Sequence, residues 1–349
     1  MKYYIIVLLL LVVSGCKDSS EEAKALSPIK SVVIEDMYTD SVSVRAIDIL
    51  NDGSLAFAGS NGKYGLYNFS SQTWNTGILK KDSLTPSFRA VAHTAEDFFM
   101  LSVASPALLY KTGNSGMELV YSEDHPKDFY DSMIFWNDKE GIAMGDPTDS
   151  CISIIITRDG GKSWSKIACS NLPTAADGEA AFAASNSNIA VYGDNAWIIT
   201  GGMESNVLFT GDKGKSWELY KTPLVQGTST TGGYSIDFYN DKLGVIIGGD
   251  YTKPNDNTAN KALTTDGGKT WNLIANGANP GYRSCIQFIP NTAGKELLAI
   301  GFEGVDYSKD QGASWTSLSE EGFFTVRFVN DSTAYAAGPN RISKLKFKR

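Results

Sequence analysis

The chain has 349 residues, with 31 Lys and Arg against 39 Asp and Glu, which gives a formal net charge of −8. A mildly acidic chain without a long basic cluster does not fit nucleic-acid binding, because affinity for a phosphate backbone rests on clustered cations. The length suits one large all-β domain as well as two smaller ones.

The N-terminus predicts export and lipid anchoring. Lys2 is followed by an apolar run, Ile5–Val13, which has the length of a signal peptide and is too short to span a bilayer as a stable helix. The run ends at Val13-Ser14-Gly15-Cys16, which resembles the bacterial lipobox. That resemblance implies cleavage before Cys16 and acylation of Cys16; the alternative is an ordinary signal peptide with a coincidental cysteine. We therefore expect a cell-envelope protein held on a bacterial membrane, either periplasmic or surface-exposed.

The segments after the signal differ in composition. Residues 1–15 are expected to form the lipoprotein signal peptide. Residues 16–28 are polar and charged around Lys17–Glu22, bury too little apolar surface to fold alone, and predict a flexible tether. Residues 29–349 are expected to form a single domain.

Seven segments in this domain predict inner strands of a repeated unit. Each is rich in aromatic or β-branched residues and is followed by further short alternating strands, with no convincing helical periodicity. The predicted starts are Val44–Leu50, Phe88–His93, Phe129–Trp136, Ala180–Ser185, Tyr234–Tyr239, Tyr282–Ile289 and Phe323–Val329. Seven units of about 44 residues predict an all-β, seven-bladed β-propeller of four-stranded antiparallel blades.

Four octets repeat the pattern Ser/Thr-x-Asp-x-Gly-x-x-Trp. The Asp should accept hydrogen bonds within its own turn, the Gly should supply unusual backbone angles, and the Trp should anchor the hairpin by burial. We predict structural turns rather than ligand or metal sites. The residues are Asp159 and Trp164, Asp212 and Trp217, Asp266 and Trp271, and Asp310 and Trp315.

These octets resemble the Asp-box, or BNR, repeat of sialidases and related propellers. A weaker copy, Thr112–Leu119, lacks the Trp, and another survives only as Ser70–Trp74. The last unit lacks a box altogether. Because an open sheet edge invites aggregation, Ile29–Glu35 is expected to supply the outer strand of the last blade and close the ring.

Three cysteines remain beyond the lipobox. Cys151 and Cys169 lie almost symmetrically about the turn at Asp159, so they would face each other across a hairpin. Both a disulfide and two buried thiols fit this placement. Cys285 lies in an apolar run and predicts a core residue.

The face opposite the octets carries the candidate site. Consecutive blade strands are antiparallel, so the starts of the inner strands and the loops between second and third strands meet there. Charged residues gather at these places and should converge on the mouth of the central channel: Arg45, Arg89, Asp131, Asp146, Glu179, Asp250 and Arg283. Guanidinium groups suit carboxylates and phosphates, which predicts an anion or peptide site; ion pairs that hold the channel shut are the alternative.

The combination of Phe-Arg strand starts with these octets resembles the photosystem II stability/assembly factor-like family. Phrases such as Met144–Pro147 and Gly178–Phe182 resemble a non-photosynthetic bacterial branch that is often labelled oxidoreductase. The resemblance implies a non-enzymatic assembly protein whose arginine patch, here Arg45, Arg89 and Arg283, contributes to binding. We expect a protein or extracellular ligand as partner, a monomer, and no cofactor.

The rival hypothesis is a sialidase-like glycoside hydrolase. Sialidases combine such boxes with an arginine clamp, here Arg45, Arg89 and Arg283, and a Tyr nucleophile, for which Tyr251 or Tyr282 would be candidates. The Arg-Ile-Pro signature of sialidases is absent, and seven starts exceed their six blades. No phosphate-binding loop, zinc pattern or Gly-x-Ser-x-Gly elbow occurs, so no metal or catalytic residue is predicted.

Overall fold

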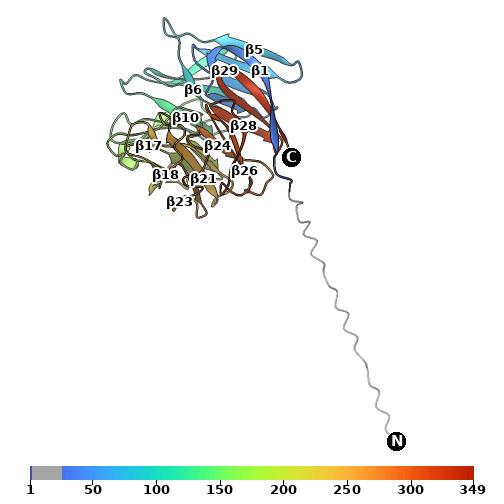
Figure 1. Cartoon of the computed structure of the whole chain (residues 1–349). Helices are drawn as coiled ribbons and strands as arrows, with labels where there is room; N and C mark the ends of the chain where they lie inside the picture. Colours follow the sequence, from blue (N-terminus) through green and yellow to red (C-terminus); the bar gives the residue numbers. More distant parts are fainter. Residues whose placement is uncertain (2–25) are drawn as a thin grey trace.

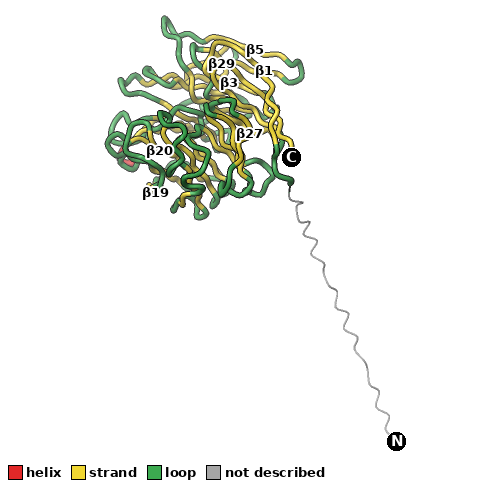
Figure 2. The backbone as a smooth tube through the Cα atoms, in the orientation of Figure 1, coloured by secondary structure: helices red, strands yellow, loops and turns green. Residues whose placement is uncertain are grey.

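The structure is a computed structural model that describes Met1 and residues 26–349 (Figure 1). This part consists of strands and loops, and one short 3₁₀ helix, η1 (Cys169–Asn171) (Figure 2). Seven antiparallel sheets form a β-propeller, as the sequence predicted. Most of the predicted signal and tether, including Cys16, lies outside the described residues. Within the described part, no helix has the length and apolar character needed to cross a membrane.

Six blades each contain four main strands that follow one another outward. Their strands are: blade 1, β2 (Ala46–Ile49), β3 (Leu55–Ala58), β4 (Lys63–Asn68) and β5 (Thr73–Ile78); blade 2, β6 (Phe88–His93), β7 (Phe98–Ser102), β8 (Ala107–Gly113) and β9 (Gly116–Glu123); blade 3, β10 (Tyr130–Phe135), β11 (Gly141–Gly145), β12 (Ser153–Thr157) and β13 (Ser165–Lys166).

Blades 4 to 6 continue this order, with two short extra strands beside blade 5. Their strands are: blade 4, β15 (Ile189–Tyr192), β16 (Asn195–Ile199), β18 (Asn206–Thr210) and β19 (Glu218–Lys221); blade 5, β20 (Thr231–Phe238), β21 (Gly244–Asp250), β22 (Lys261–Thr264) and β23 (Asn272–Leu273), extended by β14 (Glu179–Ala180) and β17 (Gly201–Gly202); blade 6, β24 (Cys285–Phe288), β25 (Leu297–Gly301), β26 (Gly304–Ser308) and β27 (Thr316–Ser319).

The seventh blade combines both ends of the described chain. The long strand β29 (Thr333–Lys348) pairs through its first part with β28 (Thr325–Asn330) and through its second part with β1 (Ser31–Ser43). The Phe347 N–H donates to the Ser332 carbonyl at 2.9 Å, so the two parts of β29 lie side by side. Figure 1 shows the blue β1 beside the red β29. The inner strand β28 contacts β2, so the inner strands form a complete ring.

The hydrophobic core lies between neighbouring blades. Strands such as β7 and β12 are buried on both faces, whereas outer strands such as β13 and β23 are exposed. Each octet Trp packs into the space between its own blade and the preceding one. Trp164 of blade 3, for example, contacts Phe99 of blade 2, with 6.4 Å between ring centroids. Burying such a large ring stabilises the contact between the two blades.

The predicted inner strand Ala180–Ser185 was wrong. The inner strand of blade 4 is β15, which starts at Ile189. The residues before it, 182–188, form an axial segment without regular structure. This segment exchanges hydrogen bonds with the inner walls of five other blades, through Val91, Met133, Ser235, Ser284 and Thr325. Contacts with so many blades place the segment on the propeller axis, where it fills the channel.

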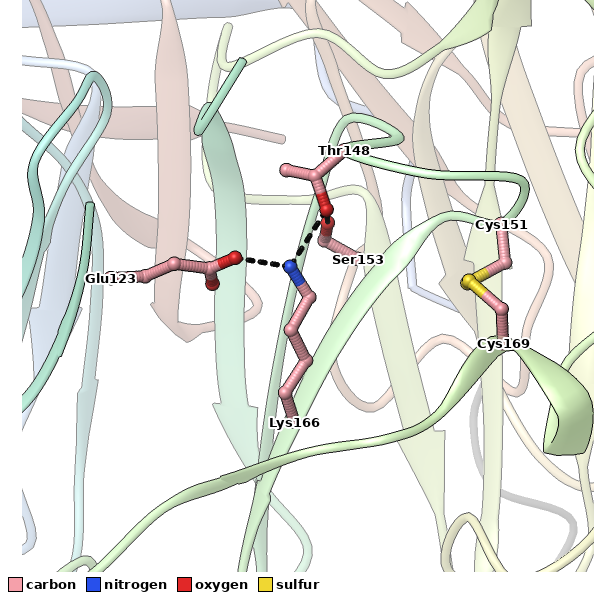
Figure 3. Close-up of a disulfide and its surroundings, with 6 residues drawn as sticks. All are labelled: Glu123, Thr148, Cys151, Ser153, Lys166 and Cys169. Carbon is pink, nitrogen blue, oxygen red and sulfur yellow. Dashed lines mark hydrogen bonds and ion pairs between the residues drawn. A yellow bond between two sulfur atoms is a disulfide. The ribbon is translucent and has the colours of Figure 1, made fainter. Parts of the chain in front are cut away.

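Cys151 and Cys169 are joined by a disulfide, with 5.4 Å between their Cα atoms (Figure 3). The bond links the residues just before β12 to η1, which follows β13. Beside it, Lys166 bonds to Glu123 of the neighbouring blade and donates to the Thr148 hydroxyl at 2.8 Å. Cys285 is buried in the core of blades 6 and 7 as a free thiol.

Candidate binding site at the channel mouth

The four octets form turns between the third and fourth strands, and we call them the box turns. In the first, Asp159 Oδ1 accepts from the Ser163 N–H at 3.0 Å and from the Thr157 hydroxyl at 2.9 Å, and Oδ2 accepts from the Ser163 hydroxyl at 2.6 Å. The same pattern recurs at Asp212, Asp266 and Asp310. Each carboxylate is thus engaged by its own turn, which fits a structural role.

The hydrogen bonds of the box turns also hold their carboxylates in the charged form. Partial burial would raise the pKa of Asp212, but the bonds from Ser216 and Thr210 outweigh it and lower that pKa to about 2. A carboxylate with this many donors has little capacity left for a metal or a ligand.

The opposite end of the axis carries a pocket of about 510 Å³, which we call the mouth pocket. Arg45 and Arg89, from the starts of the inner strands of blades 1 and 2, lie on its wall together with Asp146. The chain from Ala180 to Ala184 also lines it. Because these residues lead into the axial segment, the pocket is closed below and forms a cup.

The two arginines have no acidic partner. Among the described residues, neither Arg45 nor Arg89 forms an ion pair. The Arg45 guanidinium lies 3.9 Å from the ring centroid of Phe324, and its Nε is buried without a hydrogen-bond partner. Arg89 Nη1 donates only to the Ala183 carbonyl, at 3.3 Å. Burial, and to a smaller extent the charge of Arg89, lowers the pKa of Arg45 to about 10, so it is still a cation at neutral pH.

A local backbone irregularity recurs near the start of three inner strands. The pairing of the first two strands shifts register at Arg89 in blade 2, at Asp131 in blade 3 and at Tyr234 in blade 5. Such bulges bend the strand and turn the extra side chain out of the regular alternation. Two of the three residues, Arg89 and Tyr234, line the mouth pocket, whereas Asp131 is buried.

Two carboxyl groups occur at this end of the propeller: Asp146 on the pocket wall, and Asp131 near both Asp146 and Arg89. Asp146 Oδ1 accepts from the Ala181 N–H at 2.7 Å, and burial raises the pKa of Asp146 to about 6. Asp131 is fully buried, and neither of its oxygens has a hydrogen-bond partner. Burial and the neighbouring Asp146 raise the pKa of Asp131 well above its ordinary value, although Arg89 opposes the shift. The neutral acid is thus favoured at Asp131.

Three predicted mouth residues do not line the mouth pocket. Arg283 is buried, and its Nε donates to Asp306 of β26 at 2.7 Å, so this guanidinium is already paired. Glu179 is also buried; its Oε1 accepts from Thr200 at 2.5 Å and from Asn206 at 2.9 Å. Asp250 accepts from the Thr252 N–H and hydroxyl in a loop turn. Their chain positions were suitable, but nearby partners use their charges.

Aromatic side chains form much of the pocket wall, and the sequence had pointed to only two of them, Tyr251 and Tyr282, as candidate nucleophiles of the rival hypothesis. Phe182 stacks on Tyr234 with 3.8 Å between centroids, and Tyr282 meets Tyr234 edge-on at 4.8 Å. Phe302 lies 5.3 Å from Tyr282. Their positions in the repeat could have predicted this placement. Tyr234 and Tyr282 lie at the starts of inner strands, and Phe302 lies in a loop between second and third strands, as the charged candidates do.

A second hollow of about 860 Å³ adjoins the mouth pocket. The two share Phe129, Asp146 and Ala180 as lining residues. The walls of the second hollow are mainly acidic; they carry Asp128, Asp149, Asp177 and Glu179 in addition to Asp146, against a single cation, Lys127. Together the hollows form a continuous depression, with cations at the axial end and carboxylates at the outer end. In the described part of the chain, no cluster of three or more His, Cys, Asp or Glu could hold a metal ion.

Comparison with known proteins places the fold. No family model matches the sequence, and no curated protein matches it. A structure described as YCF48 bound to D1 peptide is similar at a TM-score of 0.65 and 12% identity, over 95% of this chain and 100% of that one. YCF48 from Cyanidioschyzon merolae is similar at 0.61 and 13%, over 91% and 98%.

Other propellers are similar to nearly the same degree. The WD40 repeats of RRP9 give a TM-score of 0.63 at 11% identity, over 92% of this chain and 100% of that one. The GH74 enzyme of Niastella koreensis gives 0.56 at 15%, over 87% of this chain and 43% of that one. At such identities the likeness establishes the β-propeller fold alone.

Proposed function

We propose that this propeller is a non-catalytic binding scaffold whose mouth pocket holds a polypeptide segment carrying a carboxylate and apolar or aromatic side chains. One observation carries the proposal: two partly buried arginines without acidic partners face a cup walled by aromatic rings. Leaving buried cations unpaired costs free energy, so a site that keeps two of them is suited to an anionic ligand. Tyrosine and phenylalanine walls suit the neighbouring side chains of a peptide.

The shape of the depression supports a polypeptide over a small molecule. The mouth pocket continues past Asp146 into the second hollow, so a ligand can extend from the axis across the face of blade 3. The reversal of charge along this path favours a segment that places its acidic group near Arg45 and Arg89 and a basic group further out. The YCF48 structure described as bound to a D1 peptide supports peptide binding by a propeller of similar architecture.

The proposed location is the bacterial cell envelope, with acylated Cys16 as the anchor. The support is the apolar run and the lipobox-like sequence before the described residues. Cys16→Ser should move the protein from the membrane fraction to the soluble extracytoplasmic fraction and abolish incorporation of labelled fatty acid. Unchanged fractionation and labelling would contradict the anchor.

A pull-down from envelope extract tests the binding function. Wild type is compared with the double variant Arg45→Ala/Arg89→Ala and with Arg158→Ala as the matched control. Arg158 lies in a box turn on the opposite face and pairs with Glu140. The proposal expects partners lost by the double variant and retained by the control. The same partners on all three proteins would contradict it.

Catalysis is tested separately with a fluorogenic sialoside. The three-arginine clamp of the sialidase hypothesis is incomplete, because Arg283 bonds Asp306 instead of facing the pocket. We expect no turnover. Turnover that Arg89→Ala abolishes would overturn the proposal of a non-catalytic scaffold.

A further inference from the structure

A second pocket, of about 490 Å³, lies on the box-turn face between blades 1 and 2, and we call it the blade 1–2 cleft. Its floor is apolar and includes Ala56, Leu66, Phe98 and Met117. The turns that follow the inner strands of both blades line its rim. The cleft is thus separate from the mouth pocket, which opens on the other face.

Its position corresponds to the spaces that tryptophan fills in other blades. Each box-turn indole occupies the space between its own blade and the preceding one. The four packing groups pair Trp164 with Phe99, Trp217 with Ile156, Trp271 with Trp197, and Trp315 with Ile274. In blade 1, Trp74 plays a similar part and donates to the Met37 carbonyl of β1 at 2.9 Å.

Blade 2 has no indole to place there. Its weak octet forms a tight hairpin in which Gly113 pairs with Gly116. Leu119, which stands on β9 at the position of the missing Trp, pairs with Tyr110 of β8, and the Leu119 side chain is exposed. Of the residues in this octet, only Met117 packs against the core between blades 1 and 2. The facing wall is also small, because Ala56 stands on the second strand of blade 1 where Phe99 stands on that of blade 2. A cleft sized for an aromatic ring results.

The charged residues on the rim of the cleft are all acidic. Asp52, Glu96 and Asp97 line the cleft, and no Lys or Arg does. Lys111 lies beside it and contacts Asp97 at 3.3 Å. Within the described chain, Asp52 and Glu96 form no ion pair. An acidic rim around an apolar floor is complementary to an aromatic side chain flanked by cations.

We propose that the blade 1–2 cleft binds a basic segment of a partner protein by taking up one of its tryptophan side chains in the position that box-turn tryptophans occupy elsewhere. The partner's lysines or arginines would lie over Asp52 and Glu96. Burial of the ring supplies affinity, and the rim charges supply orientation and salt dependence.

The test is fluorescence anisotropy with a labelled pentapeptide in which one tryptophan is flanked by two lysines on each side. Saturable binding is expected. Replacing the peptide tryptophan by alanine should weaken it by roughly tenfold or more, as loss of a buried aromatic ring does. Met117→Trp, which gives blade 2 its own indole, should weaken binding to a similar extent. Glu96→Lys, on an exposed side chain, should weaken it by a few-fold and reduce its salt dependence.

Arg89→Ala is the control, because it alters only the mouth pocket and should leave this binding unchanged; a failure here is thus distinguishable from failure of the proposed mouth site. Equal binding of the tryptophan and alanine peptides would mean charge attraction alone and would overturn the proposal. Lack of saturable binding, or unchanged affinity of a folded Met117→Trp variant, would overturn it as well.

Discussion

The two faces of this propeller differ in whether their charged side chains have hydrogen-bond and ion-pair partners. On the box-turn face, Asp159, Asp212, Asp266 and Asp310 are each satisfied by donors two to four residues away. At the mouth, the guanidinium groups of Arg45 and Arg89 have no acidic partner within ion-pair distance among the residues that the structure describes, and burial lowers their pKa values. We therefore expect the box-turn carboxylates to contribute to stability and the mouth arginines to contribute to ligand binding.

Removing a box-turn tryptophan should produce the largest effect on stability. Trp271 is 7% exposed and meets Phe238 edge-on, with 5.9 Å between ring centroids, in the core cluster that also contains Trp197. Trp271→Ala is expected to lower the free energy of unfolding by about 3–5 kcal/mol, the range for a buried large-to-alanine change. Urea unfolding measures this. A loss below about 1 kcal/mol would show that the box-turn face is not the structural one.

Removing a box-turn carboxylate should have a smaller effect on stability. Asp266→Ala eliminates acceptors for the Thr270 N–H, the Thr270 hydroxyl and the Thr264 hydroxyl. We expect a loss of about 1–2 kcal/mol, as for other turn and cap carboxylates, with peptide binding at the mouth unchanged. Weakened binding with intact stability would reverse the comparison of the two faces.

The strand starts and box turns were predictable because local patterns determine them. Strand alternation and turn chemistry act over a few residues, so six of seven inner strands and all four box turns were located. Ala180–Ser185 failed because its small and apolar residues fit a strand or a buried loop equally well. Hydrogen bonds from five distant blades decide that this part of the chain continues into the axial segment.

The mouth was only partly predictable for the same physical reason. Arg45, Arg89 and Asp146 reached it because strand polarity places them on one face. Arg283 did not, because Asp306 comes from another strand of the same blade and binds its guanidinium. The position of a side chain along its strand can be predicted from the sequence. The partner that neutralises its charge depends on how the strands pack.

The pH dependence of binding should distinguish the mouth from the box turns. The pKa of Asp146 is raised to about 6, above the ordinary value of 3.8, so its ionised form is disfavoured in the folded protein. Ionised Asp146 therefore costs stability above pH 6, and this cost is relieved progressively as the pH falls from 6 toward the ordinary value of 3.8. Over that fall the pocket also gains net positive charge, so an acidic peptide should bind several-fold more tightly. Binding titrations from pH 7.5 to pH 5 measure this.

Asp146→Asn is the matched control for the pH experiment. It keeps the size of the side chain and removes the titration, so binding should be strong and nearly independent of pH over this range. A pH dependence that survives in Asp146→Asn would assign the effect to another group.

The smallest expected effect is that of a mouth arginine on stability. Arg45 contributes a cation–π contact with Phe324, worth about 0.5–1 kcal/mol, but its burial without an acidic partner offsets this gain. Arg45→Met should therefore change the free energy of unfolding by less than about 1 kcal/mol while it abolishes most peptide affinity. A large loss of stability would mean that Arg45 is structural.

Isothermal titration calorimetry tests the central claim most directly. Wild type, Arg45→Ala/Arg89→Ala and Asp266→Ala are each titrated with a short synthetic peptide that carries a terminal carboxylate next to a phenylalanine. We predict binding to wild type and to Asp266→Ala with similar affinity, and a loss of at least tenfold in the double arginine variant. Equal affinity for wild type and the folded double variant would contradict the assignment of the mouth as the binding face.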